Sequence, residues 1–167
     1  NADGTQAAVM LRANDNKGRW VVSVGNDGQL HNRHRLTDPA WINWSFNDFG
    51  WMDDGRTLWL LSEESGHSHL YTQTGSGKPR ALTSGTWEAS APELSADGKR
   101  FYVLCNQQAP HDYEVCSVDT TSGQVRELTA LDGVEDFSLS PDGSQLLVRH
   151  SAAYLPAQLA VVPASGG

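Results

Sequence analysis

The sequence has few cysteines, no long apolar run and few basic residues. Two cysteines among 167 residues cannot supply the framework of disulfides that holds a cystine-rich domain together. No window approaches the roughly 18 apolar residues of a membrane-spanning helix, and the first residues lack the basic and apolar regions of a signal peptide. We therefore expect a water-soluble segment, in the cytoplasm or the periplasm, without a membrane partner.

The charge balance excludes another class of partner. Lysine and arginine number 12 against 20 aspartate and glutamate residues, which gives a formal net charge of -8. A surface of this sign repels the phosphates of nucleic acids and of anionic lipids. Hydrophobic residues make up 38% of the chain, enough to bury the core of one domain. We expect residues 1–167 to belong to one domain, with Asn1 and Ala2 as a cloning remnant.

Two short motifs repeat along the chain. A Leu-Thr pair recurs every 46 residues, at Leu36-Thr37, Leu82-Thr83 and Leu128-Thr129. An Asp-Gly pair recurs out of phase with it, at Asp3-Gly4, Asp54-Gly55, Asp97-Gly98 and Asp142-Gly143. Repeats of this length, built from four strands each, are typical of propeller blades.

Each repeat contains segments with the two-residue alternation and the β-branched or aromatic content of strands. A strand such as 58–61 or 101–105 follows the Asp-Gly pair, and another such as 69–73 or 113–118 comes next. A short strand ending in Leu-Thr and the first strand of the following unit complete the pattern. No stretch shows a sustained apolar period of 3.6 residues, so we expect no helices.

This pattern predicts an all-β fold, a partial β-propeller of about four consecutive four-stranded antiparallel blades. The blades are expected at residues 3–37, 38–83, 84–129 and 130–167, with the first and last incomplete. Propellers have about four to eight blades, so the missing strands favour a fragment of a larger ring. An immunoglobulin-like sandwich is the alternative, but it does not need the same turn at the same phase in each unit. Because an open ring exposes apolar blade faces, we expect the fragment to self-associate.

The two cysteines, Cys105 and Cys116, are eleven residues apart and are predicted on neighbouring strands of one hairpin. A disulfide between such strands is geometrically feasible. With a single pair and no framework of spacings, we interpret them as two small half-buried thiols.

Several segments resemble one group of propellers. Residues 94–98 (LSADG) and 139–143 (LSPDG) are similar to the Ser-Pro-Asp-Gly signature of propellers related to TolB and to the prolyl oligopeptidase group. Residues 41–49 (WINWSFNDF) and 82–88 (LTSGTWE) resemble the C-terminal half of the N-terminal β-propeller of dipeptidyl peptidase IV-type serine peptidases. The similarity covers almost all of residues 37–167.

The resemblance implies an eight-bladed propeller that caps an α/β-hydrolase domain with a Ser-Asp-His triad. Such an enzyme releases dipeptides from peptide N-termini with proline or alanine in second place. The implied partners are a peptide substrate, the hydrolase domain and the remaining blades of the same parent chain. This chain has no Gly-x-Ser-x-Gly elbow, so we expect no catalytic residue, cofactor or metal in it and no activity of its own. A TolB-like propeller that serves as a protein-binding scaffold is the second hypothesis.

The resemblance also implies candidate site residues. The family has an aromatic residue followed by an arginine in a loop that faces the peptidase site. Those positions fall on Trp44 and Ser45, and we expect Trp44, Ser45 and Phe46 to line the substrate pocket. Serine cannot form the paired hydrogen bonds that an arginine at this position would donate to a carbonyl or carboxylate, which leaves the substrate preference open. Packing of Trp44 against the neighbouring blade is the structural alternative.

Four other motifs are interpreted as structural. Trp87, next to a strand end, is expected to wedge between blades. Glu63-Glu64 is not assigned to the family's amine-binding glutamate pair, which belongs to an upstream segment. His67 and His69 could share a metal, but no third ligand is close in the sequence. Residues 14–18 (NDNKG) are interpreted as a turn, because the later acid of a calcium loop is missing.

Overall fold

The computed structural model describes residues 1–131 and 133–166. Within these residues fourteen β-strands form four antiparallel sheets. Their bounds are β1 (Gln6–Arg12), β2 (Gly18–Gly25), β3 (Leu30–Thr37), β4 (Phe49–Trp51), β5 (Thr57–Ser62), β6 (His69–Thr74), β7 (Arg80–Ala81), β8 (Ala89–Leu94), β9 (Arg100–Ala109), β10 (Asp112–Asp119), β11 (Val125–Glu127), β12 (Val134–Leu139), β13 (Gln145–Ala152) and β14 (Leu155–Pro163). The described residues contain no helix long and apolar enough to cross a membrane.

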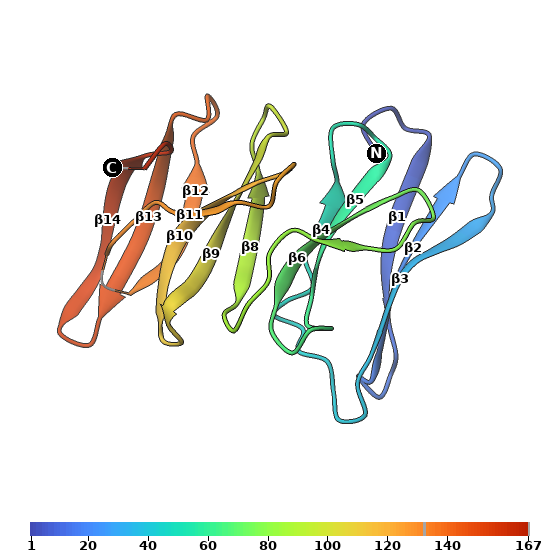
Figure 1. Ribbon diagram of the computed structural model, residues 1–167, viewed down its shortest axis with the longest axis horizontal. Coiled ribbons are helices and arrows are strands. Elements are labelled where there is room, and N and C mark those ends of the chain that lie inside the picture. The colour runs from blue at the N-terminus through green and yellow to red at the C-terminus, as the bar shows by residue number, and fades with distance from the viewer. Residues whose placement is uncertain (132, 167) are drawn as a thin grey trace.

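The four sheets follow one another in chain order, from the first at the right of Figure 1 to the last at the left. Their strand orders are β1-β2-β3, β4-β5-β6-β7, β8-β9-β10-β11 and β12-β13-β14. Each sheet is a meander of neighbouring antiparallel strands, which is the build of a propeller blade. The first and last sheets have three strands each, and the two sheets between them have four. The predicted partial β-propeller is therefore confirmed, while the exact blade limits stay a prediction.

The repeated Asp-Gly pair forms the turn between the first two strands of a blade. Gly55, Gly98 and Gly143 have φ angles of 63°, 66° and 70°. Glycine adopts this left-handed conformation without steric cost. In the second blade the Oδ1 atom of Asp54 accepts a hydrogen bond from the amide of Thr57 at 2.8 Å. Both residue types thus recur for a local geometric reason.

Most of the apolar core lies between sheets. One cluster joins the second and third sheets and consists of Leu61, Leu70, Leu82, Trp87, Ala89, Phe101, Val103, Cys105, Cys116 and Val118. A second joins the third and fourth sheets and consists of Tyr102, Leu104, Val115, Leu128, Val134, Phe137, Leu146, Val148 and Ala164. Strand β9 supplies both clusters, since Phe101 and Val103 point to one face and Tyr102 and Leu104 to the other. An inner blade is therefore buried on both faces.

The interface between the first and second sheets has a different chemistry. It buries three side chains that can carry charge: Arg19, Arg33 and His34 are 0%, 7% and 6% exposed. Arg19 donates a hydrogen bond to the carbonyl oxygen of Leu61, and Arg33 donates one to that of Gln73. Hydrogen bonds from buried arginines thus contribute to the contact between these two sheets.

The interpretation of Cys105 and Cys116 as free thiols is wrong, because a disulfide joins them. In the β9–β10 pairing Cys105 lies opposite Glu114, and Cys116 lies opposite Val103. Residues two apart on a strand share a face, so the two cysteines are diagonal neighbours on one face. Their Cα atoms are 5.9 Å apart, within the usual range for a disulfide. The sequence indicates the hairpin but not this register.

The connections gather at two ends of the strands. In Figure 1 the β3–β4, β5–β6 and β7–β8 connections lie at the lower end, and the tight turns β2–β3 and β4–β5 lie at the upper end. The β6–β7 turn at Gly75-Ser76 lines one cavity with the β2–β3 turn and is counted with the upper end. The lower end, called the loop end below, carries the predicted site residues. The upper end is called the turn end.

Candidate functional site

Residues 38–48 form the connection between β3 and β4 at the loop end. The amide of Asp38 donates to the carbonyl oxygen of Lys17 at 3.1 Å, and the amide of Ile42 donates to that of Asn16 at 2.9 Å. Both acceptors belong to the β1–β2 connection, the segment interpreted as a turn. That turn therefore supports one side of the 38–48 loop.

Arg19 of β2 forms hydrogen bonds to the end of this loop and to β5. Its Nη1 atom donates to the carbonyl oxygen of Phe46 at 3.2 Å and to Oδ1 of Asn47. Its Nη2 atom donates to the carbonyl oxygen of Leu61 in β5 at 3.0 Å. Burial lowers the pKa of Arg19 to about 10, so the guanidinium stays charged at neutral pH. Because guanidinium donors are directional, this residue fixes the loop relative to both sheets.

The three predicted site residues follow one another in this supported loop. Trp44 is half-buried, and its ring centroid lies 4.9 Å from the guanidinium carbon of Arg12 in β1. Ser45 is exposed and Phe46 is half-buried. Trp41, three residues earlier than Trp44, is 62% exposed. Trp44 thus contacts the neighbouring first sheet, as the packing alternative expects, and also retains open surface, so its role in a pocket stays a prediction.

Acidic side chains lie near the loop. Oε2 of Glu64 is 2.7 Å from Nε2 of the buried His34. Burial lowers the pKa of His34, and the hydrogen bond to Glu64 opposes that shift. Burial raises the pKa of Glu63, and the negative charges of Glu88 and Asp38 act in the same direction. The loop end therefore combines aromatic surface with acidic side chains, beside the guanidinium groups of Arg12 and Arg19.

Trp87 and His69 have structural surroundings. Trp87 is 9% exposed in the core between the second and third sheets, as the wedge interpretation expects. The ring of His69 meets it edge to face, with centroids 5.1 Å apart. Nδ1 of His69 lies 3.0 Å from Oγ1 of Thr83, and Nε2 lies 3.1 Å from the carbonyl oxygen of Gly85. Both ring nitrogens are engaged in the fold, and residues 1–131 and 133–166 hold no group of three His, Cys, Asp or Glu that could bind a metal.

Comparison with known protein families shows which family this chain belongs to. The family described as the dipeptidyl peptidase IV (DPP IV) N-terminal region matches residues 2–157. The chain belongs to this family. A curated relative, the probable dipeptidyl-aminopeptidase B of Trichophyton verrucosum, is 28% identical over 162 residues. That match covers 90% of this chain and 17% of the relative, so the chain spans about a sixth of the relative's length.

Solved structures show the same fold. The dipeptidyl peptidase 4 of Porphyromonas gingivalis matches with a TM-score of 0.80 at 19% identity, over 94% of this chain and 22% of that chain. TolB from Acinetobacter baumannii matches with a TM-score of 0.69 at 22% identity, over 98% of this chain and 39% of that chain. Similarity at these identities establishes the propeller architecture alone.

Sequence reasoning missed Arg19 and Arg12. Both residues lie one position outside the strands predicted at 7–11 and 20–24, and neither belongs to a motif of the family resemblance. The available signal was the position of Arg19 in β2, where it shares a face with Val21 and Ser23. That face is less apolar than the face with Trp20, Val22 and Val24, so the sequence alone does not mark it as the buried one. In the structure Arg19, Val21 and Ser23 form the buried face of β2, whereas Trp20, Val22 and Val24 are half-buried.

Proposed function

We propose that this chain is a non-catalytic part of the propeller of a dipeptidyl peptidase-type serine exopeptidase. It gates access to the substrate site and partly lines that site. The nucleophile and its partners lie in an α/β-hydrolase domain outside this chain, and the peptide substrate reaches them past the loop end. Membership of the DPP IV N-terminal family over residues 2–157 is the observation that carries this proposal.

In this proposal Trp44, Ser45 and Phe46 border the pocket for the first residues of the substrate. The half-buried rings of Trp44 and Phe46 offer apolar surface, and the exposed Ser45 between them leaves space that a longer side chain would occupy. The bonds from Arg19 to Phe46 and Asn47 hold this surface in one position. A rigid pocket surface favours catalysis because it holds the substrate in the orientation that reacts.

The test uses the full-length parent protein and Gly-Pro and Ala-Pro chromogenic dipeptide substrates. Wild type should cleave at least one of them. Trp44→Ala should lower kcat/KM by about tenfold, because loss of an aromatic contact with the substrate costs on the order of 1.4 kcal/mol. The melting temperature of the variant should stay close to that of wild type.

Trp41→Ala is the matched control, because it removes an exposed tryptophan from the same loop outside the predicted pocket. Its kcat/KM should remain within about twofold of wild type. Equal losses in both variants, or a Trp44→Ala loss explained by unfolding, would leave Trp44 as a packing residue. A wild-type parent inert on all such substrates would remove the peptidase proposal.

A protein-binding scaffold is the second candidate function. The similarity to TolB, at a TM-score of 0.69, is the observation that favours it. A Gly-x-Ser-x-Gly elbow in the parent sequence downstream of this chain supports the peptidase, whereas a different domain there supports the scaffold.

The blade faces at the two ends of the chain are the remaining contact surfaces. Val9, Leu11 and Leu30 are 49%, 50% and 73% exposed on the first sheet. Leu159 and Val161 are 68% and 61% exposed on the last. In the parent these faces pack against the remaining blades, and in the isolated segment they cause self-association.

A further inference from the structure

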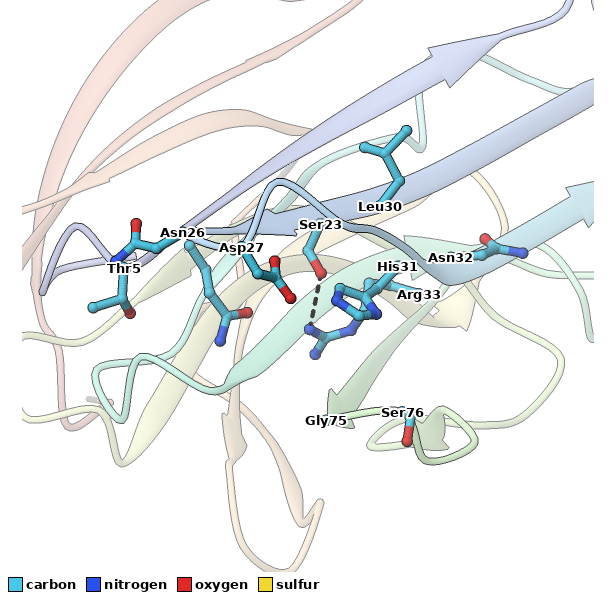
Figure 2. Close-up of a pocket in the computed structure, with 12 residues that line it drawn as sticks. Thr5, Ser23, Asn26, Asp27, Leu30, His31, Asn32, Arg33, Gly75 and Ser76 are labelled. Atoms are coloured by element: carbon cyan, nitrogen blue, oxygen red, sulfur yellow. Dashed lines mark hydrogen bonds between the residues drawn. The ribbon is translucent and has the colours of Figure 1, made fainter.

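A cavity of about 740 Å³ lies at the turn end of the interface between the first two sheets. Its walls come from the β2–β3 turn, from β3 and from the β6–β7 turn at Gly75-Ser76. Figure 2 shows Thr5, Ser23, Asn26, Asp27, His31 and Arg33 around it. None of residues 38–48 contributes to this lining, so the cavity is separate from the candidate substrate loop.

An irregularity in β3 places Arg33 in this cavity. Val21 pairs with His34 and Val22 pairs with Asn32, so Arg33 has no partner of its own on β2. Such a bulge changes the direction of a side chain relative to regular alternation. Arg33 is 7% exposed, and it turns inward between the two sheets. The fold thus places a cation in the cavity wall.

The guanidinium of Arg33 meets only neutral partners at long distances. Nη1 donates to Oγ of Ser23 at 3.3 Å, and Nη2 donates to the carbonyl oxygens of Arg56 and Gln73 at 3.3 and 3.4 Å. Its Nε has no hydrogen-bond partner among the described residues. The Trp51 ring centroid lies 5.5 Å from the guanidinium carbon, which stabilises the cation without neutralising it.

Within residues 1–131 and 133–166 no carboxylate forms an ion pair with this buried cation. The ion pairs between described residues, His34–Glu64, Lys99–Asp97 and Arg149–Glu135, do not involve Arg33. Burial lowers the pKa of Arg33, which is the expected effect of desolvating a charge. A buried charge without a counter-charge is costly, so an anion in the cavity would recover part of that cost.

The other cavity residues fit an oxyanion with a defined orientation. His31 lies two residues before Arg33 on β3 and also lines the cavity, so its ring supplies a second donor. The Asp27 carboxylate points into the same space from the turn and opposes an anion, although its Oδ1 accepts a bond from the amide of Gln29 at 3.0 Å. We propose that this cavity binds a small oxyanion, a carboxylate or a phosphate, on Arg33 with help from His31.

The test measures binding of inorganic phosphate and of acetate to the full-length parent by calorimetry, in a buffer free of both ions. Saturable binding of either ion is expected, and the two titrations identify which oxyanion the cavity takes. Arg33→Gln should weaken binding about tenfold or more, as expected for loss of hydrogen bonds to a charged group. Asp27→Asn keeps the turn acceptor and removes the opposing charge, so it should tighten binding by about twofold or more.

Lys78→Gln is the matched control, because it removes an exposed positive charge near the β6–β7 turn outside the cavity lining. Its affinity should stay within about twofold of wild type. Circular dichroism and melting curves establish that each variant is folded, and the surface variant Asp27→Asn keeps the test decisive if Arg33→Gln does not fold. The proposal is overturned if neither ion binds to wild type, or if Lys78→Gln weakens binding as much as Arg33→Gln. An Asp27→Asn variant that binds more weakly than wild type also overturns it.

Discussion

Reduction of the Cys105–Cys116 disulfide should destabilise the third blade by about 3 kcal/mol. The two cysteines are 1% and 0% exposed in the core between the second and third sheets. They are separated by 11 positions along the chain, and the chain-entropy relation for closing a loop of this size gives about 3 kcal/mol at 25 °C. The effect arises in the unfolded chain, so the native contacts of β9 and β10 should stay in place.

Hydrogen exchange of the β9 and β10 amides in the parent protein is the suitable assay, because a multidomain protein does not give one free energy of unfolding. After the parent is unfolded, reduced and refolded in a thiol reductant, these amides should exchange roughly 100-fold faster than in the oxidised protein. The double variant Cys105→Ala/Cys116→Ala should show no response to the same treatment. Unchanged exchange in a sample whose bond is shown to be open, by alkylation and mass measurement, would refute the cross-link argument.

Two further predictions concern protonation and assembly. Burial, followed by the 2.9 Å hydrogen bond to Glu88 and its charge, raises the pKa of Tyr113 to about 12. Because the folded pKa is above the ordinary value of 10.0, the stabilisation is complete below pH 10 and is lost as the pH rises toward 12. Ultraviolet titration should therefore show a tyrosine transition near pH 12. Tyr113→Phe should remove this transition, and Glu88→Gln should move it to lower pH. An unchanged titration curve in both variants would contradict the assignment to Tyr113. The isolated segment should self-associate in light scattering, less so with Val9→Lys and Val161→Lys, and a monodisperse monomer at high concentration would end that proposal.

The sequence repeat was sufficient to predict most of the fold. Asp-Gly pairs need a left-handed glycine at each first turn, and the turn geometry at Gly55 and Gly98 shows the reason for their recurrence. Between the turns, two-residue alternation located the strands, because side chains of successive residues face opposite blades. Local chemistry and period thus determined the order of strands and the incomplete first and last blades.

The repeat could not predict the register between paired strands or which polar side chains are buried between sheets. The Cys105–Cys116 bond depends on a diagonal placement that follows only from the β9–β10 register. The bulge beside Arg33 shifts one residue relative to its neighbours, and nothing in the local sequence marks it. Trp44, Ser45 and Phe46 came from family resemblance, and their role in a substrate pocket stays a prediction.

The polar interface between the first two sheets connects these observations. Arg19 at the loop end bonds to the carbonyl oxygen of Leu61, and Arg33 at the turn end bonds to that of Gln73, so two buried cations bridge the same pair of sheets. Apolar side chains of similar volume would avoid the desolvation cost of two guanidinium groups. Apolar contacts have no direction, however, whereas the bonds from Arg19 also fix Phe46 and Asn47 of the candidate loop. The two buried arginines therefore lower stability through desolvation, and in return their directional hydrogen bonds hold the loop end and the cavity around Arg33 in a single arrangement.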